Sequence, residues 1–134
     1  MDFRKQLKFV SELIDNFDIG PNATRVGVSS FSTRYHENIA VGTYANKEDI
    51  KKAIGKIPHY TGDTYTYDAL DGVRTRAFKE GVVRPGVKQI VIVLTDGASY
   101  NAELTREAAK QLKVCTDNLR QSQCSLYNYI KMSS

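Results

Sequence analysis

The chain has 134 residues, of which 41% are hydrophobic and 25% are charged, and its net charge is +4. This length suits one globular domain, and the basic residues are interleaved with acids rather than gathered in the concentrated patch that nucleic-acid binding requires. The sequence also contains no run of about 18 apolar residues and no charged-then-apolar leader, so we expect neither a membrane span nor an export signal in this chain.

The first half of the chain predicts a helix, two strands and a second helix. Apolar residues at spacings of three and four predict an amphipathic helix before Gly20-Pro21, with an inner stripe of Phe3, Leu7, Val10, Ile14 and Phe17. Residues 24–31 and 34–41 predict strands, and the short connection between them predicts an antiparallel hairpin. Asn46 is expected to cap a short helix whose inner face holds Ile50, Ala53, Ile54 and Ile57.

The second half predicts a longer helix, a buried strand and a last helix. The longer helix follows HYTGDTYT and turns inward Ala69, Leu70, Val73, Ala77 and Phe78. Residues 90–94 are apolar at every position, which is typical of a parallel strand covered on both faces, so we expect a central strand there. The inner face of the last helix is expected to hold Leu104, Ala108, Leu112 and, at its far end, Cys115.

The order of these elements predicts a three-layer α/β domain. In this architecture helices cover both faces of a doubly wound, Rossmann-like sheet, which here carries an antiparallel edge hairpin. A helix that packs on a parallel sheet normally follows a strand in a right-handed crossover, yet no strand precedes the first helix. We therefore expect the chain to be a piece of a larger domain.

Two polar side chains are placed to bind a metal ion. Asp96 follows the aliphatic strand, and ligands of open α/β sheets bind at the carboxyl ends of strands. Thr64 stands before a helix in a loop that Gly62 allows to turn tightly. A hydroxyl and a carboxylate suit a hard cation such as Mg²⁺. Taken singly, Thr64 has the alternative role of a helix N-cap, and Asp96 that of a turn acid.

The remaining signals are less specific. Asn22 begins an N-glycosylation triplet in a turn-like setting, which matters if the chain enters the secretory pathway. Cys115 and Cys124 predict two free thiols or one local bridge. The histidines, His36 and His59, belong to no catalytic motif and are expected on the surface.

Three segments, in their order and spacing, resemble the von Willebrand factor A domain of matrilins, collagens and integrins. They are FRKQLKFVSELIDNFDIGPNATRVGVSSFS, TGDTYTYDALDGVRTRAF and VKQIVIVLTDGAS. The resemblance covers roughly Met1 to Lys113. It implies a partial von Willebrand factor A domain at residues 1–113 and a divergent C-terminal tail at residues 114–134.

The resemblance also implies a function. Members of this family are mostly extracellular binding modules with a metal-ion-dependent adhesion site, in which Thr64 and Asp96 match the threonine and the last aspartate. The implied cofactor is Mg²⁺ or Mn²⁺, and the implied partner is an extracellular-matrix or cell-surface protein whose acidic side chain completes the coordination. The tyrosines expected around this face are Tyr60, Tyr65, Tyr67 and Tyr100.

The sequence departs from the family at both ends. The Asp-x-Ser-x-Ser motif that follows the family's first strand is absent, and neither Ser29-Ser30 nor Ser32 replaces it, so we expect metal binding to be weak or absent. The first strand and the last strand and helix are thus expected to be missing. The end of the chain predicts a disordered tail or a misread sequence, with a makeshift strand at residues 124–130 as the alternative. An empty middle of the sheet would make the chain marginally stable or prone to aggregate.

Three functions remain open at this point. The first is a non-enzymatic adhesion or matrix-binding module with a partial metal site. The second is a metal-independent interaction module or a non-functional fragment. The third is a Mg²⁺-dependent phosphatase-like enzyme, which would need a second acid near Asp96, whereas TDGAS supplies one.

Overall fold

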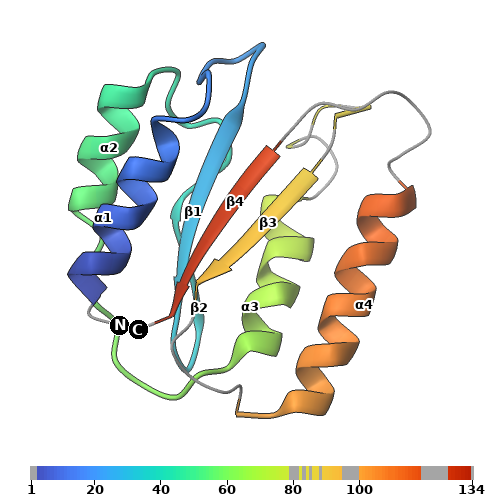
Figure 1. The fold of residues 1–134 in the computed structure, drawn as a ribbon. Coiled ribbons are helices and arrows are strands. Elements are labelled where there is room, and N and C mark those ends of the chain that lie inside the picture. The colour runs from blue at the N-terminus through green and yellow to red at the C-terminus, as the bar shows by residue number, and fades with distance from the viewer. Residues whose placement is uncertain are drawn as a thin grey trace.

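A sheet lies between two layers of helices in this protein (Figure 1). The structure, a computed structural model, describes residues 3–78, 82, 84, 86–87, 89–94, 100–118 and 127–133, with residues 112–118 and 127–133 described by their backbone. Helices α1 (Phe3–Ile14) and α2 (Lys47–Gly55) cover one face, and α3 (Thr66–Gly72) and α4 (Ala102–Asn118) cover the other. The predicted three-layer α/β architecture is confirmed. Among the described residues, no helix is both long and apolar enough to cross a membrane.

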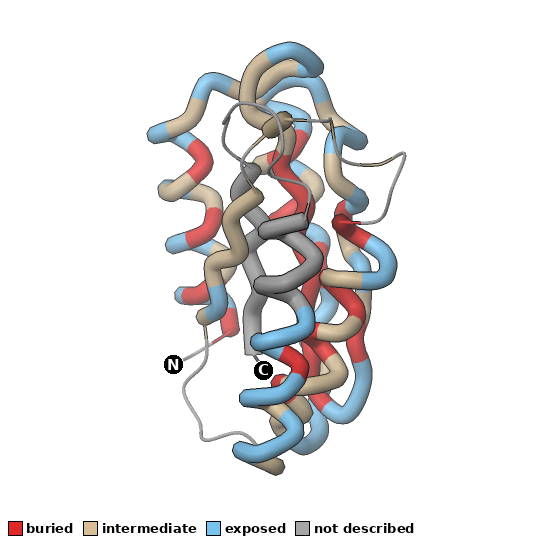
Figure 2. Tube along the Cα trace, turned by 90° about the vertical axis from the view of Figure 1, so that its right-hand side faces the viewer, coloured by how far each residue is buried: buried red, intermediate tan, exposed pale blue. Residues whose placement is uncertain are grey.

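The first helix layer forms where the sequence predicts it. Asn46 caps α2, because its side-chain oxygen accepts a hydrogen bond from the Asp49 backbone N–H at 2.9 Å. The apolar stripes of both helices pack on the sheet, and the residues of α1 and α2 that are buried there are Phe3, Gln6, Val10, Ile14, Ile50 and Ile54. Figure 2 shows how buried and exposed residues alternate along these helices, as expected for helices with one face on a core.

The sheet has four strands in the order β2-β1-β4-β3. β1 (Arg25–Phe31) and β2 (Tyr35–Ile39) form the predicted antiparallel hairpin, with a bulge between Val28 and Ser29. β4 (Tyr127–Ser133) runs parallel to β1 and to β3 (Gln89–Leu94). The hairpin thus lies at one edge, and β4 lies inside the sheet.

The position of β4 corrects the expectation of a disordered tail. Its seven residues pair with β1 from Arg25↔Tyr127 to Phe31↔Ser133, and it also pairs with β3 along that strand's whole length. The makeshift strand expected as the alternative is therefore present, although it lies further along the chain than residues 124–130. The sequence YNYIKMS has no strong strand pattern, so pairing on both sides, rather than local preference, accounts for it. The boundary at residue 113 stays a prediction, and α4 runs across it to Asn118.

β4 lies where the missing first strand was expected, between the hairpin and β3. Among the described residues no strand precedes α1, and α1 begins at the end of the sheet where β4 finishes (Figure 1). α1 also contacts β4. The middle of the sheet is therefore paired on both sides, and an empty middle, the reason to expect marginal stability, does not apply.

Two further expectations about the second half are wrong. β3 was expected to be central and covered, but it lies at the edge of the described sheet, and Val93 is 37% exposed. Leu104 was expected to face inward, but it is 49% exposed, whereas Ala108 is buried as predicted. An apolar run indicates that a strand or helix face favours burial. Whether that face is actually covered depends on helices and strands from elsewhere in the chain. The side chains of Leu112 and Cys115 lie outside the described part.

The second helix layer contains an irregular turn that was not predicted. α3 continues into η1 (Val73–Ala77), a π-helical segment, where one regular helix was expected. All the predicted inward residues are nevertheless buried, namely Ala69, Leu70, Val73, Ala77 and Phe78. Gly72 lies against the ring of Tyr35 on β2, and a Cβ there would approach Tyr35 Cδ2 to 2.6 Å. The close approach of α3 to the hairpin thus requires glycine.

Candidate functional site

Thr64 lies at the carboxyl edge of the sheet, between two segments that are distant in sequence. The next residue, Tyr65, donates its backbone N–H to the carbonyl of Ser32, just after β1, at 3.1 Å. The backbone N–H of Tyr100, just before α4, donates to the carbonyl of Thr64 at 2.9 Å. The loop that carries Thr64 is thereby fixed to the end of β1 and to the entrance of α4.

The loop turns tightly on Gly62, as predicted. Gly62 has a φ of 145°, and a Cβ at this position would collide with the hydroxyl of Thr33. The same hydroxyl accepts a hydrogen bond from the Asp63 backbone N–H at 3.2 Å. Thr33 and Gly62 together set the path of the chain into Thr64.

The alternative role of Thr64 as a helix N-cap is wrong. The N-cap of α3 is Tyr65, and no side chain makes a capping hydrogen bond there. Thr66, the first residue of the helix, is buried, whereas Thr64 is only half-buried. The hydroxyl of Thr64 therefore has no capping function at α3.

Three tyrosines form a cluster beside Thr64. The rings of Tyr65 and Tyr67 stack with centroids 5.5 Å apart, and Tyr65 and Tyr100 meet at a tilt with centroids 4.8 Å apart. Tyr100 is 67% exposed. We call Tyr65, Tyr67 and Tyr100 the tyrosine cluster. Tyr60 does not join it, because its ring stacks on His36 with centroids 3.7 Å apart.

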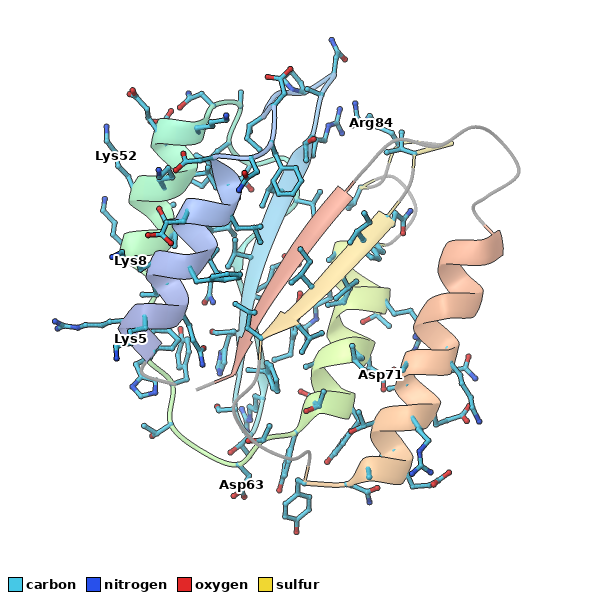
Figure 3. The ribbon with its side chains drawn as sticks, viewed as in Figure 1. Lys5, Lys8, Lys52, Asp63, Asp71 and Arg84 are labelled. Atoms are coloured by element: carbon cyan, nitrogen blue, oxygen red, sulfur yellow. The ribbon has the colours of Figure 1, made fainter. Side chains whose placement is uncertain are left out.

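The surroundings of Tyr65 in the tyrosine cluster disfavour the ionised form of its phenol. Desolvation raises the pKa of Tyr65, and Tyr100, Asp63 and Tyr67 raise it further through their charges. Asp63 projects outward at this edge of the molecule (Figure 3). The cluster therefore offers apolar ring faces and phenol groups next to an exposed carboxylate.

The donors around Thr64 fit a hard cation in kind but are few. Thr64 offers a hydroxyl oxygen, and Asp96, the other predicted ligand, lies outside the described residues. The described part of the chain contains no group of three His, Cys, Asp or Glu residues that would hold a metal ion. Thr64 is thus the single predicted ligand whose position is known.

The serines at the end of β1 have structural partners. Ser29 donates its hydroxyl to the phenol oxygen of Tyr35 at 2.9 Å, and the hydroxyl of Ser30 accepts from Asn38 Nδ2 at 2.7 Å. Both serines are buried, as is Ser32. The hydroxyls of Ser29 and Ser30 are thus engaged within the hairpin, and the expectation that the serines do not replace the missing motif stays a prediction.

The predictions missed two features beside the site. Asp68 accepts a hydrogen bond from the backbone N–H of Tyr35 at 2.9 Å and so ties α3 to the start of β2. An acid in the first turn of a helix was the available signal. A cavity of about 360 Å³ also lies beside the loop, lined in part by Thr33, His36 and His59. Of the two histidines, His59 is exposed, as expected, and stacks on Phe3 with centroids 4.6 Å apart, while His36 is half-buried.

The predicted glycosylation residue lies at the other end of the sheet. Asn22 is exposed, in a turn before β1. The neighbouring carbonyl of Pro21 accepts hydrogen bonds from Arg25 Nε at 2.9 Å and from an Arg84 guanidinium nitrogen at 3.1 Å. Figure 3 shows Arg84 and Asp63 at opposite ends of the molecule. Glycosylation of Asn22 stays a prediction, and Cys124 lies outside the described residues.

Comparison with known families supports the resemblance. A model of the von Willebrand factor type A domain matches residues 1–127. The chain belongs to the von Willebrand factor type A domain family. The match extends past residue 113, where the resemblance read from the sequence ended.

The curated relatives of this von Willebrand factor type A domain are much longer proteins. The chain is 31% identical over 114 residues to the human collagen alpha-6(VI) chain, covering 84% of this chain and 5% of the relative. It is 29% identical over 113 residues to chicken matrilin-1, covering 84% and 22%. It is 30% identical over 112 residues to human vitrin, covering 84% and 16%.

Solved structures share the fold of this domain. Proximal thread matrix protein 1 from the mussel byssus, whose MIDAS motif is occupied by zinc, aligns with a TM-score of 0.65 and 23% identity over 95% of this chain and 36% of its own. The manganese-loaded TRAP protein of Plasmodium vivax aligns with a TM-score of 0.64 and 17% identity over 91% and 48%. At these identities the likeness shows the fold alone.

Proposed function

We propose that this domain is a protein-binding module of the extracellular matrix or cell surface, and that it binds through the carboxyl edge of the sheet around Thr64. The tyrosine cluster is the observation that carries this proposal, because tyrosines supply much of the binding energy at protein interfaces. Tyr100 is 67% exposed and is tied to Thr64 through its backbone. The names of the relatives, which include collagen and matrilin chains, support a role in the matrix.

We further propose that Mg²⁺ or Mn²⁺ strengthens this contact weakly, with Thr64 and Asp96 as its protein ligands. Hydroxyl and carboxylate oxygens are the ligands that such cations prefer, and hydrated Mg²⁺ needs few protein oxygens. An acidic side chain of the partner would complete the coordination. Support comes from the family resemblance and from the half-buried position of Thr64 at this edge.

We also propose that the domain is non-catalytic and that it acts outside the cell. A glycan on Asn22 would lie at the amino end of β1, since Asn22 precedes Arg25, whereas Thr64 follows the carboxyl end of that strand. Glycosylation would therefore leave the tyrosine cluster accessible. A metal-independent module would use the same cluster without a cation.

Thermal unfolding during a titration with Mg²⁺ or Mn²⁺ separates these two versions. A metal-assisted module gives a rise in Tm that Thr64→Ala and Asp96→Ala remove. Thr75→Ala is the matched control, because the Thr75 hydroxyl donates within its own helix to the carbonyl of Asp71 at 2.8 Å. The metal-assisted version would be ruled out if Tm rose equally in the unmodified chain and in the Thr64→Ala, Asp96→Ala and Thr75→Ala variants. It would also be ruled out if the unmodified chain showed no rise.

Binding to immobilised matrix proteins tests the face itself. The double variant Tyr65→Ala/Tyr100→Ala should lose most of the binding, since aromatic anchors at interfaces each contribute about 2 kcal/mol or more. Phe9→Ala is the control, because Phe9 on α1 is an exposed aromatic residue, 45% accessible, outside the cluster. Retained binding by the tyrosine variant, or equal loss in both variants, would place the interface elsewhere.

A further inference from the structure

A cavity of about 360 Å³ lies between the turn of the β1–β2 hairpin and the segment that follows α2. We call it the hairpin cavity. Two hydrogen bonds hold its two sides together. The Asp63 backbone N–H donates to the Thr33 hydroxyl at 3.2 Å, and the Tyr65 backbone N–H donates to the Ser32 carbonyl at 3.1 Å. The hairpin cavity therefore has fixed walls, and its volume lies in the range of small-ligand sites.

Three side chains that line the hairpin cavity carry nitrogen donors, namely Arg34, His36 and His59. The guanidinium group of Arg34 is always charged and has five N–H donors, and an imidazole has at least one N–H in either protonation state. Within the described part of the chain, no hydrogen bond or ion pair engages any of these three side chains. Their donors are therefore available to a ligand in the cavity.

Both imidazoles are held in place by aromatic rings. His36 stacks on Tyr60 with centroids 3.7 Å apart and ring planes 8° apart. His59 stacks on Phe3, which is buried in the core, with centroids 4.6 Å apart and ring planes 16° apart. Stacking covers a face of each imidazole, whereas the nitrogens lie at the ring edge and can still donate. Side chains that are already ordered lose less entropy when a ligand binds.

The described lining of the hairpin cavity contains no carboxylate. Asp63 follows the lining segment but is exposed and projects outward (Figure 3), and Glu37 lines a different cavity. Arg34 also borders a cavity that Asp68 and Asp71 line, yet no ion pair joins it to either acid among the described residues. The charges of the hairpin cavity therefore favour an anionic group.

The rest of the described lining is rich in hydroxyl groups, which belong to Ser32, Thr33, Tyr60 and Thr61. The Thr33 hydroxyl accepts from the Asp63 backbone N–H, so its own hydrogen remains available to donate. Hydroxyl groups both donate and accept, as the hydroxyls of a sugar do. The lining is thus suited to a polyhydroxyl ligand with an anionic group.

We propose that the hairpin cavity binds a sugar that carries a sulfate or phosphate ester, with the ester on Arg34, His36 and His59. Such an ester has three terminal oxygens, and each of the three side chains supplies charge-assisted or neutral donors to them. The hydroxyls of the lining bind the sugar ring. This site uses neither Thr64 nor the tyrosine cluster, so it is additional to the proposed binding face.

A titration of the full chain, followed by NMR shifts of the backbone amides at constant ionic strength, tests the site. The probes are N-acetylglucosamine 6-sulfate and N-acetylglucosamine 6-phosphate, and the tighter of the two identifies the kind of ester. Shifts should concentrate at residues 32–36 and 59–61. Inorganic sulfate and unmodified N-acetylglucosamine should both bind more weakly than the esters.

Variants of the donors make the test specific. Arg34→Gln and His59→Phe should each weaken binding of the ester about tenfold, as the loss of a hydrogen bond to a charged group does. Phenylalanine at position 59 keeps a ring to stack on Phe3, and both side chains are exposed, so Tm should stay unchanged. Lys52→Gln is the matched control, because it removes an exposed charge of α2 outside the cavity (Figure 3).

The proposal would be overturned if neither ester shifted these amides, or if inorganic sulfate or the unmodified sugar bound as tightly as the esters. It would also be overturned if Lys52→Gln had the same effect on binding as Arg34→Gln. The Tyr65→Ala/Tyr100→Ala protein should bind the ester normally. Failure of this proposal and failure of the proposed function therefore give different results.

Discussion

The two halves of this domain are built differently. In residues 3–57, the helices, the strands and the Asn46 cap form where local sequence signals predict them, and β1 and β2 are neighbouring segments that pair as a hairpin. In the second half, β4 reaches back across the sequence to pair with β1. The first half is therefore specified mainly by local sequence, whereas a long-range pairing with little local signal completes the sheet.

Proline in β4 should cause the largest loss of stability. Ile130→Pro removes a backbone donor from a strand with neighbours on both sides, where proline is not tolerated. We expect it to cost a large share of the roughly 5–15 kcal/mol that stabilises a domain. Urea unfolding followed by circular dichroism measures this, with Ile130→Val as the conservative control. Unchanged unfolding of the proline variant would mean that β4 is not part of the sheet.

A methyl group between α3 and the hairpin should have the next largest effect. Gly72→Ala places a Cβ 2.6 Å from Tyr35 Cδ2, and such overpacking costs about 1–3 kcal/mol. Gly55→Ala is the matched control, since a Cβ there meets no atom within 4 Å and alanine stabilises a helix by about 0.5–1 kcal/mol. The urea midpoints should therefore move in opposite directions, and a shared direction would contradict the packing described for Gly72.

Loss of the α2 cap should cost less. Asn46→Ala removes the acceptor of the Asp49 backbone N–H, at a cost of about 1 kcal/mol. Asn46→Ser keeps an acceptor oxygen and, unlike aspartate, places no second carboxylate beside Asp49, whose Oδ2 accepts from Asn46 Nδ2 at 2.8 Å, so it should retain most of the stability. The test is the Tm of both variants against the unmodified chain. An equal loss in the two variants would show that the cap is not the source of the effect.

The smallest effect is the pH dependence of the tyrosine cluster. The pKa of Tyr65 is raised in the folded chain, so its contribution is fully present below the unfolded-state pKa of about 10 and is lost as pH rises through the folded-state value. Urea midpoints between pH values of about 9 and 11 should therefore fall more for the unmodified chain than for Tyr65→Phe. Parallel falls would show that the environment of Tyr65 does not disfavour its ionised form.

Most of the first half could be predicted because its signals are local. The spacing of Phe3, Val10 and Ile14, the cap at Asn46 and the glycine at position 62 each depend on a few neighbouring residues. The place of β4 could not be predicted, because backbone ladders with β1 and β3, and not its own side-chain pattern, select it. The edge position of β3 could not be predicted for a related reason, because an aliphatic run does not indicate whether a strand has neighbours on one side or on both.

The candidate site was predictable to a similar degree. The loop of Thr64 and its tight turn follow from the sequence, and so does its place at the carboxyl edge. The contact between Tyr65 and Tyr100 joins a loop to the entrance of α4, and the bond from Tyr100 to Thr64 does the same. Such contacts depend on how distant elements are brought together, which local patterns do not specify.

Hydrogen exchange at the amides of β4 tests the central claim most directly. If β4 completes the sheet between β1 and β3, its inner amides should exchange about as slowly as those of Val26 and Val28 in β1, because both strands open with the same core. Exchange of residues 127–133 at the rate of an unstructured peptide, while β1 stays protected, would contradict the account and return the C-terminal segment to the tail that the sequence suggested.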